Sequence, residues 1–211
     1  MKSLVILISG RGSNMKALID APLPCKIAAV ISNKPDASGL EIAKKHGLET
    51  RALDQRSYSG REEFDMALAE AIDAYEPDLV ALAGFMRILG EDFVTRYQGK
   101  LMNVHPSLLP SFPGLYTHRQ ALKEGVKIHG CTVHFVTRQL DRGPIIVQAA
   151  VQIVPGDTEE TLAKRVLQQE HLIYPQAVRW FMEGRLKLSD NGIDVSNAAF
   201  DGSVLFSPGL G

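Results

Sequence analysis

Short runs of apolar residues mark the first half of the chain, and each run ends at glycine or a polar residue. These runs lack the polar alternation of a strand with one solvated face. They are typical of strands that are buried on both faces of a parallel sheet. The pattern predicts strands over 4–9, 26–32, 49–53, 79–82 and 101–105.

Between these runs, apolar residues recur at helical spacing. The clearest case is 61–75, where Phe64, Leu68 and Ile72 fall on one side of the predicted helix. Further helices are predicted after Asn14 and over 40–46 and 91–97. Strands that alternate with helices form right-handed βαβ units. We therefore expect an α/β fold with a Rossmann-like, mostly parallel sheet flanked by helices, and ligands bind such sheets beyond the carboxyl ends of the strands.

The pattern changes after residue 105. Proline, glycine and serine are frequent in 106–117, which predicts an irregular loop. Two β-branched runs, 127–135 and 145–154, flank a turn at 141–144 and predict a pair of antiparallel strands. These strands would form an antiparallel β extension of the sheet.

A long C-terminal helix is predicted over 158–183, with Thr158 as its N-cap. Pro175 lies inside this segment and is predicted to kink or split the helix, because proline lacks the backbone N–H that a helix needs. We expect a single domain over 1–186 that consists of a nucleotide- or phosphate-binding half (1–105) and a second half (106–186). A tail over 187–211 would follow it.

Composition narrows the class of protein. The 211 residues are 45% hydrophobic and 22% charged, with a net charge of −1, as in an ordinary globular protein. A nucleic-acid partner is not expected, because no basic field is available to hold a phosphate backbone. No apolar stretch approaches the roughly 20 residues that span a bilayer, and the N-terminal run is too short for a signal peptide. We therefore expect a cytoplasmic protein with no membrane partner.

The segment Ser9–Asn14 follows the first predicted strand and precedes a helix. Its two glycines would let the backbone approach a ligand, and the N–H groups of the helix N-terminus would attract an anion. The dinucleotide fingerprint requires a third glycine, but Met15 stands there, so the loop suits one phosphate better than a pyrophosphate. The alternative is a tight turn in which Ser13 or Asn14 only caps the helix. The sequence favours neither.

Two polar residues close the strand 101–105. Asn103 and His105 project on the same face, because side chains alternate along a strand. An amide and a protonated imidazole that point at one place can stabilise a tetrahedral oxyanion. A nearby carboxylate would hold the histidine in its charged form, and Asp141 is the candidate, although spacing alone does not bring it close. Taken alone, one Asn and one His in a strand are more often structural.

Cysteine and histidine give no prediction of a metal. Cys25 and Cys131 form neither a disulfide framework nor a zinc ligand set, and both are expected to be small buried thiols. His129, Cys131 and His134 lie close in sequence, but strand alternation puts His134 on the opposite face from the other two. No metal site is therefore predicted.

Several motifs together resemble the signature of the folate-dependent formyltransferases. Asn103-Val-His105-Pro-Ser-Leu-Leu-Pro, Pro113-Gly114 and Leu140-Asp141-x-Gly143-Pro144-Ile145-Ile146 carry the resemblance. Ser9-Gly10-x-Gly12-Ser13-Asn14 and Ala83-Gly84-Phe85-Met86-Arg87-Ile88-Leu89 are similar to the branch of this family that acts on 5-phosphoribosylglycinamide. The resemblance covers roughly residues 1–186, in order and without large gaps, and the half 106–186 would be the folate side.

The resemblance implies a role for each matching residue. Gly12, Ser13 and Asn14 would bind the substrate phosphate, and Glu170 would hold the ribose hydroxyls. The co-substrate would be 10-formyltetrahydrofolate, with no metal, and its pocket would be lined by Arg61, Met86, Arg87, Ile88, Leu89, Asn103, Thr137, Arg138, Gln139, Leu140 and Asp141. Leu167 departs from the family pattern, in which a polar or basic residue often stands near the nucleotide.

The resemblance also implies a reaction, formyl transfer to the amine of 5-phosphoribosylglycinamide in purine synthesis. Asn103 and His105 would stabilise the oxyanion, His105 would donate a proton, and Asp141 would keep His105 charged and oriented. The partners would be small molecules, and the protein a monomer or homodimer. The alternatives are a methionyl-tRNA or sugar-nucleotide formyltransferase, a formyltetrahydrofolate hydrolase, or a non-catalytic binding module. The methionyl-tRNA formyltransferase and the hydrolase would normally carry an additional domain, which this chain is not expected to have.

Overall fold

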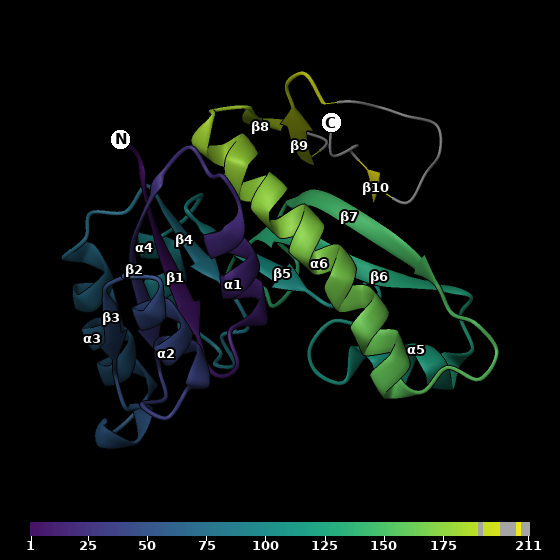
Figure 1. The fold of residues 1–211 in the computed structure, drawn as a ribbon, viewed down its shortest axis with the longest axis horizontal. Helices are drawn as coiled ribbons and strands as arrows, with labels where there is room; N and C mark the ends of the chain where they lie inside the picture. The colour runs from purple at the N-terminus through teal and green to yellow at the C-terminus, as the bar shows by residue number, and fades with distance from the viewer. Residues whose placement is uncertain (190–191, 199–205, 208–211) are drawn as a thin grey trace. The chain divides into compact units, whose positions relative to one another are not determined.

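In the computed structural model, the described residues are 1–189, 192–198 and 206–207 (Figure 1). The chain divides into two compact units, Met1–Asn103 and Val104–Gly211. The fold is α/β, as the sequence predicts.

The first unit is a parallel sheet whose hydrogen-bonded neighbours follow the order β3-β2-β1-β4-β5. Its strands are β1 (Ser3–Ile8), β2 (Lys26–Ser32), β3 (Thr50–Ala52), β4 (Leu79–Leu82) and β5 (Leu101–His105), the last of which crosses into the second unit. The chain moves from β1 to β2 and β3 and then returns to β4 on the other side of β1. The loops after β1 and β4 therefore leave the same edge of the sheet at a topological switch point, where open α/β sheets bind ligands.

The helices of the first unit pack in pairs. They are α1 (Ser13–Asp20), α2 (Ser38–Lys45), α3 (Arg61–Asp73) and α4 (Glu91–Arg96), with a short 3₁₀ helix η1 (Gln55–Ser57) after β3. Helix α1 contacts α2, and α3 contacts α4. Leu4 to Ile8 of β1 have no exposed surface, and neither do Phe64 and Leu68 of α3. Each such side chain contributes about 1.5–3 kcal/mol when fully buried, which explains why continuous apolar runs predicted these strands.

The second unit centres on the antiparallel pair β6 (Ile128–Phe135) and β7 (Ile145–Gln152), as predicted. The strand β10 (Phe206–Ser207) pairs with β7, also antiparallel. The long helix α6 (Glu159–Met182) packs on β6 and β7 and also contacts α5 (Thr117–Glu124). Figure 1 shows α6 as the longest helix of the chain.

Thr158 caps α6, as the sequence predicts. Its hydroxyl accepts the backbone N–H of Thr161, and the Thr161 side chain accepts the N–H of Thr158 in return. The prediction that Pro175 could split the helix is wrong, because α6 continues through it. Pro175 removes one backbone hydrogen bond, but the apolar side of α6, including Leu162, Val166 and Ile173, is fully buried, and this packing offsets the loss.

Several elements of the second unit have no counterpart in the predictions. Helix α5 follows the predicted loop; it is short and strongly polar, and of its residues only Thr117 and Ala121 are buried. Strands β8 (Leu186–Ser189) and β9 (Gly192–Val195) form a small antiparallel sheet at the start of the predicted tail. The rest of the tail prediction falls largely on 190–191, 199–205 and 208–211, which lie outside the described residues.

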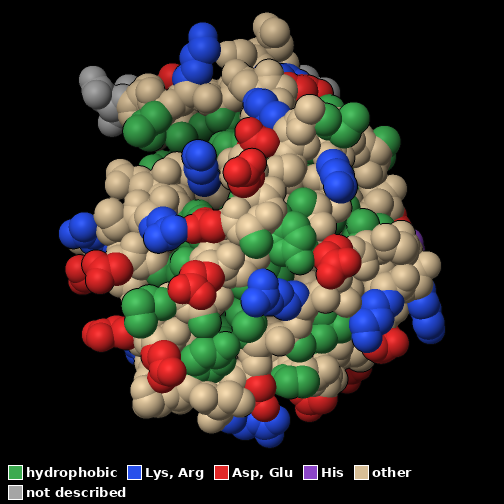
Figure 2. All heavy atoms as spheres, turned by 90° about the vertical axis from the view of Figure 1, so that its left-hand side faces the viewer, with side chains coloured by type: hydrophobic (Ala, Val, Ile, Leu, Met, Phe, Trp, Pro, Cys, Tyr) green, Lys and Arg blue, Asp and Glu red, His purple; other side chains and the backbone are tan. Residues whose placement is uncertain are grey.

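The surface is mixed in charge. On the face drawn in Figure 2, lysine and arginine side chains are interspersed with aspartate and glutamate, with apolar patches between them. This distribution gives that face no continuous basic stripe of the kind that follows a nucleic-acid backbone. Among the described residues, no helix is both long enough and apolar enough to cross a bilayer.

Candidate active site

The predicted phosphate loop lies between β1 and α1. Gly12 is the residue before α1 and has a left-handed backbone, with φ 72° and ψ 31°. A Cβ at this position would lie 3.1 Å from the Cα of Gly39, and Gly39 itself donates its N–H to the Gly10 carbonyl at 3.0 Å. Glycine is required here for both conformation and close approach.

Neither Ser13 nor Asn14 serves as the N-cap of α1. Gly12 occupies the cap position, and the cap makes no side-chain hydrogen bond. Ser13 is half-buried and Asn14 is buried. A capping role therefore does not explain these two side chains, and the N-terminal N–H groups of an eight-residue helix suit an anion.

The segment Met86–Leu89 follows β4 in the same unit. Met86 and Ile88 expose 71% and 58% of their surfaces, so the segment presents apolar side chains to solvent. Its end is held by Asp65 of α3, whose Oδ2 accepts the backbone N–H of Gly90 at 2.7 Å. Burial raises the pKa of Asp65, against the opposing effects of the Gly90 N–H and of Arg87 and Arg61.

Arg87 and Arg61 differ in their surroundings. The Arg87 guanidinium carbon lies 4.3 Å from the centre of the Phe64 ring, and Nη1 donates to Gln55 Oε1 at 3.1 Å. Arg61 is the first residue of α3 and is exposed. Arg87 is therefore fixed by the protein, whereas Arg61 is largely solvated.

The predicted catalytic residues occupy β5 and the turn after β6. Asn103 is half-buried on β5, and His105 ends that strand and is 6% exposed. Asp141 lies between β6 and β7, with a left-handed φ of 52°. Its Oδ2 is 3.6 Å from Nδ1 of His105, and the two side chains are 8% and 7% exposed. The structure thus brings together the two predicted residues that spacing alone could not connect.

Both polar ends of this pair have further neighbours. The N–H of Gly114 donates to Asp141 Oδ2 at 2.8 Å, and Nε2 of His105 lies 3.1 Å from the carbonyl oxygen of Phe112. A carbonyl only accepts, so Nε2 carries a proton in this arrangement. Phe112 and Gly114 both belong to the predicted loop 106–117, which therefore forms one wall of the site.

His134 is a third residue at the Asp141 carboxylate. Its Nε2 lies 3.9 Å from Asp141 Oδ1, and the side chain is 2% exposed. Burial lowers the pKa of His134, while its hydrogen bond to the Phe135 carbonyl and the nearby Asp141 act in the opposite direction. The sequence presented His134 only as a member of a possible metal cluster. Among the described residues, no three His, Cys, Asp or Glu side chains are grouped to hold a metal.

Thr132 and Gln148 also shape the site, and sequence reasoning missed both. They stand opposite each other on β6 and β7. Thr132 Oγ1 donates to the Ser107 carbonyl at 2.7 Å and accepts the Leu109 N–H at 3.0 Å, and Gln148 Nε2 donates to the Leu109 carbonyl at 2.9 Å and to Thr132 Oγ1 at 2.9 Å. This clamp holds the backbone that follows His105. The only sequence signal for this clamp is the presence of two polar residues at facing positions of two predicted strands that are otherwise apolar.

The remaining predicted residues lie in the second unit. Glu170 and Leu167 are on α6, where Glu170 is 7% exposed and Leu167 is half-buried. Thr137 is half-buried in the turn that carries Asp141, and Arg138, Gln139 and Leu140 are exposed. The Thr137 hydroxyl donates to the Gln139 carbonyl at 3.2 Å, and the Arg142 N–H donates to the same oxygen at 3.3 Å, so the turn is internally hydrogen-bonded.

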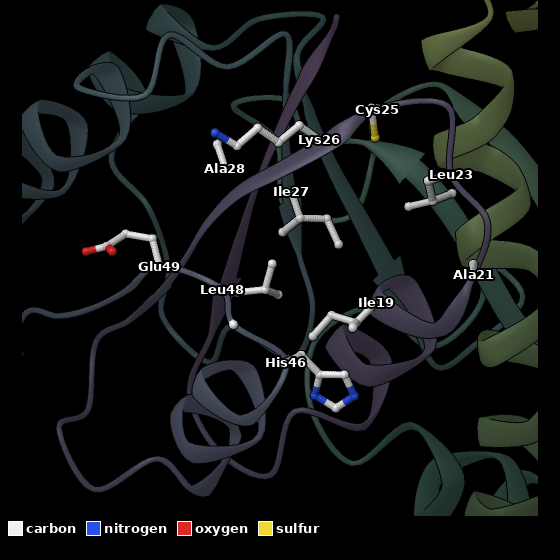
Figure 3. A pocket seen from close by; sticks show the side chains of 11 residues that line it. Ile19, Ala21, Leu23, Cys25, Lys26, Ile27, Ala28, His46, Leu48 and Glu49 are labelled. Carbon is white, nitrogen blue, oxygen red and sulfur yellow. The ribbon is translucent and has the colours of Figure 1, made fainter.

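A cavity of about 650 Å³ in the first unit contains none of the predicted site residues (Figure 3). Cys25 and Ile27, at the amino end of β2, line it together with Ile19, Leu48 and His46. It therefore lies at the edge of the sheet opposite to the loops after β1 and β4. The expectation of two buried thiols holds for Cys131, but Cys25 is partly exposed. Burial and the nearby Asp78 raise the pKa of Cys25.

These features define an α/β protein of the formyl transferase family. The sequence model of that family, described as formyl transferase, matches residues 1–178, and the chain belongs to this family. It is 52% identical over 193 residues to phosphoribosylglycinamide formyltransferase of Escherichia coli (strain K12), covering 90% of this chain and 91% of that protein. The corresponding enzyme of Haemophilus influenzae is 44% identical over 195 residues, covering 90% and 92%. The crystal structure of glycinamide ribonucleotide transformylase 1 from Symbiobacterium toebii superposes with a TM-score of 0.91 at 47% identity, covering 93% of this chain and 95% of that one.

Proposed function

We propose that the protein transfers the formyl group of 10-formyltetrahydrofolate to the amine of 5-phosphoribosylglycinamide, a step of purine biosynthesis. The observation that carries this proposal is the buried Asp141 carboxylate beside His105, in a chain of the formyl transferase family. The similarity to two phosphoribosylglycinamide formyltransferases supports the choice of substrate. A cytoplasmic location and a monomeric or dimeric state, both expected from the sequence, stay predictions.

The substrate amine attacks the formyl carbon, and a tetrahedral oxyanion forms. Asn103 and protonated His105 donate hydrogen bonds to that oxygen, which is the group whose charge develops in the transition state. The bond between the formyl carbon and the folate N10 then breaks, N10 takes up a proton from His105, and the proton that the attacking nitrogen loses returns to His105 directly or through a water. His105 supplies the proton from Nε2, which requires the formyl oxygen or an ordered water to replace the Phe112 carbonyl.

Asp141 assists the reaction without touching the substrate carbon. Its carboxylate lies beside Nδ1 of His105 and so favours the charged imidazole on which the proton donation depends. The Gly114 N–H holds the same carboxylate oxygen. His134 lies beside the other oxygen of the carboxylate, with its Nε2 3.9 Å from Oδ1.

The proposed substrate roles are those that the family resemblance implies for the matching residues. Gly12, Ser13 and Asn14 bind the phosphate with the N–H groups of α1, and Glu170 holds the ribose hydroxyls. The formyl donor is bound by Arg61, by the segment Met86–Leu89 and by Thr137–Asp141. Asn103 contacts both the donor and the oxyanion.

The proposed reaction is tested by following the change in folate absorbance that accompanies loss of the formyl group. The protein is incubated with 10-formyltetrahydrofolate and 5-phosphoribosylglycinamide, and the product amide is detected by mass. Deformylation that depends on the amine supports the proposal. Deformylation without the amine identifies a hydrolase, and no deformylation identifies a binding module, so either result contradicts it.

A further inference from the structure

A chain of buried and part-buried hydrogen bonds in the first unit connects Ser9, at the start of the predicted phosphate loop, to the predicted donor-binding segment Met86–Leu89. The backbone N–H of Met86 donates to Ser9 Oγ at 2.7 Å, and Ser9 Oγ donates to Asn33 Oδ1 at 2.6 Å. Asn33 Nδ2 then donates to Gln55 Oε1 at 2.8 Å, and Arg87 Nη1 donates to the same oxygen at 3.1 Å. We call Ser9, Asn33, Gln55 and Arg87 the polar relay.

The relay lies at the carboxyl edge of the sheet. Ser9 follows β1 and is 6% exposed, and Asn33 follows β2 and has no exposed surface. Gln55 opens η1, and its backbone N–H donates to the Asn33 carbonyl at 3.2 Å. Hydrogen bonds in such a low-dielectric setting are stronger than at the surface and reinforce one another. The relay therefore holds its members in one arrangement.

Gln55 is the member on which Arg87 depends. Among the described residues it is the only hydrogen-bond acceptor of the Arg87 guanidinium. The Phe64 ring fixes the face of the guanidinium, but stacking on a ring leaves rotation in the plane free. The bond to Gln55 removes that freedom.

We propose that Gln55 is a positioning residue of the formyl-donor pocket. It presets Arg87, and through Asn33 and Ser9 the backbone of Met86, before the folate binds, so that binding does not have to order them. The proposal rests on the proposed function, because it takes Met86 and Arg87 as donor-binding residues. The phosphate-binding residues Gly12–Asn14 do not contact Gln55, and the backbone around them is also held by the Gly39–Gly10 and Lys16–Gly12 bonds.

The test separates the two substrates kinetically. Gln55→Met keeps the length of the side chain but removes the acceptor oxygen. We expect its KM for 10-formyltetrahydrofolate to rise about tenfold, the size of one lost hydrogen bond to a charged group. The KM for 5-phosphoribosylglycinamide and kcat should change by no more than about threefold, because neither the phosphate loop nor His105 contacts Gln55. Gln98→Met, at an exposed position of the same unit, is the matched control and should behave as the wild type.

Gln55→Glu is the rescue variant, because it restores an oxygen that can accept from both Asn33 and Arg87. Its donor KM should lie closer to the wild type than that of Gln55→Met. Three outcomes overturn the proposal: an unchanged donor KM in Gln55→Met, equal impairment of the Met and Glu variants, or a parallel rise of both KM values. Thermal unfolding checks that each variant folds. If Gln55→Met does not fold, Gln55→Asn, which is too short to reach both donors, replaces it.

Failure of the relay is distinguishable from failure of the proposed function. A wild type that transfers the formyl group, with a Gln55→Met variant of normal donor KM, overturns only the relay. If the wild type transfers nothing, calorimetric titration with 5-formyltetrahydrofolate decides the matter. Tighter binding by the wild type than by Gln55→Met still supports the relay, equal binding overturns it, and no folate binding at all overturns both proposals.

Discussion

The carboxylate of Asp141 lies 3.6 Å from Nδ1 of His105, and the same oxygen accepts the Gly114 N–H at 2.8 Å. The first distance is longer than a direct hydrogen bond, so the interaction between carboxylate and imidazole is electrostatic in this arrangement. Both side chains are less than a tenth exposed, and solvent screens their interaction only weakly. A small approach of either side chain would make a charge-assisted hydrogen bond.

The first prediction concerns that charge. Asp141→Asn keeps an oxygen for the Gly114 N–H but removes the negative charge beside His105. We expect kcat for formyl transfer to fall about 100-fold or more, the range for loss of a positioned general acid, with a smaller change in the KM values. Steady-state kinetics at pH 7 measures this.

Asp194→Asn is the control for Asp141→Asn. Asp194 is an exposed aspartate of β9 in the same unit, and removing its charge should leave kcat unchanged. Equal activity of the two variants would show that the charge of Asp141 has no role in catalysis.

Asn103→Ala tests the second oxyanion donor. Loss of one such donor costs about 3 kcal/mol of transition-state stabilisation, or roughly 100-fold in kcat. Substrate binding should be weakened far less, because the oxyanion exists only after attack. Single-turnover formyl transfer, with both substrates saturating, isolates this step. Near-normal turnover would remove Asn103 from the mechanism.

The sequence predicts most elements of the first unit because those elements depend on residues that are close together in the sequence. The Leu4–Ile8 run is buried on both faces, and Gly12 has the left-handed backbone that only glycine adopts without strain. The proximity of Asp141 to His105 is different, because it depends on how β6 and the turn before β7 return to the end of β5. The periodicity of apolar residues does not show which segments meet in the fold. Only the family motif indicated that Asp141 acts together with His105.

The sequence missed one helix and several polar contacts of the site. Helix α5 is short and buries only Thr117 and Ala121, so few apolar residues mark it. The Phe112 carbonyl and the Gly114 N–H act through the backbone, where residue identity says little. Thr132 is a polar residue in a strand that reads as apolar. These backbone groups and Thr132 act through polar contacts between separate segments, and no local propensity predicts such contacts.

The clamp formed by Thr132 and Gln148 leads to a third prediction. Thr132→Val has nearly the same shape but leaves the Leu109 N–H, the Ser107 carbonyl and the Gln148 amide without a shared partner in a fully buried site. An unsatisfied buried polar group costs about 1–3 kcal/mol, so the free energy of unfolding should fall by about that amount. Urea denaturation measures it.

The clamp should also affect catalysis, because it holds the backbone directly after His105. Thr132→Ser retains the hydroxyl and is the control, and it should keep most of both stability and kcat. If Thr132→Val lowers neither, the hydrogen bonds of the clamp contribute nothing to the site.

Gly143 tests the approach of the Asp141 turn to β6. A Cβ at Gly143 would lie 1.8 Å from the carbonyl oxygen of Phe135, which belongs to the backbone and cannot rotate away. Gly143→Ala must therefore displace the turn that carries Asp141, and we expect a loss of about 1–3 kcal/mol in stability, as for an overpacked core, together with reduced kcat. Gly60→Ala is the control, since its extended backbone accepts any residue and a Cβ there meets nothing within 4 Å. Equal stability of the two variants contradicts the predicted clash.

The last prediction is a pH dependence of stability that originates at His129. Burial and the neighbouring His118 lower the pKa of His129 to about 4, and burial also lowers the pKa values of His118 and His134. The two rings are hydrogen-bonded, with His118 Nδ1 3.1 Å from His129 Nε2, which requires one of these nitrogens to be unprotonated. In the unfolded chain, histidine titrates near 6.5. Between these values the unfolded state binds more protons, so stability is full above pH 6.5 and decreases as the pH falls toward 4.

We expect the wild type to lose about 1–2 kcal/mol of unfolding free energy from this pair between pH 7 and pH 5, after allowance for solvent screening. His129→Gln cannot titrate and should show a smaller decrease over the same interval. His46→Gln, at an exposed imidazole, should keep the wild-type slope. Urea denaturation of the three proteins at both pH values gives the slopes directly. The comparison uses the change in unfolding free energy between the two pH values. A destabilisation of His129→Gln that is the same at both pH values therefore does not affect it. An unchanged slope in His129→Gln would assign the pH dependence to other groups.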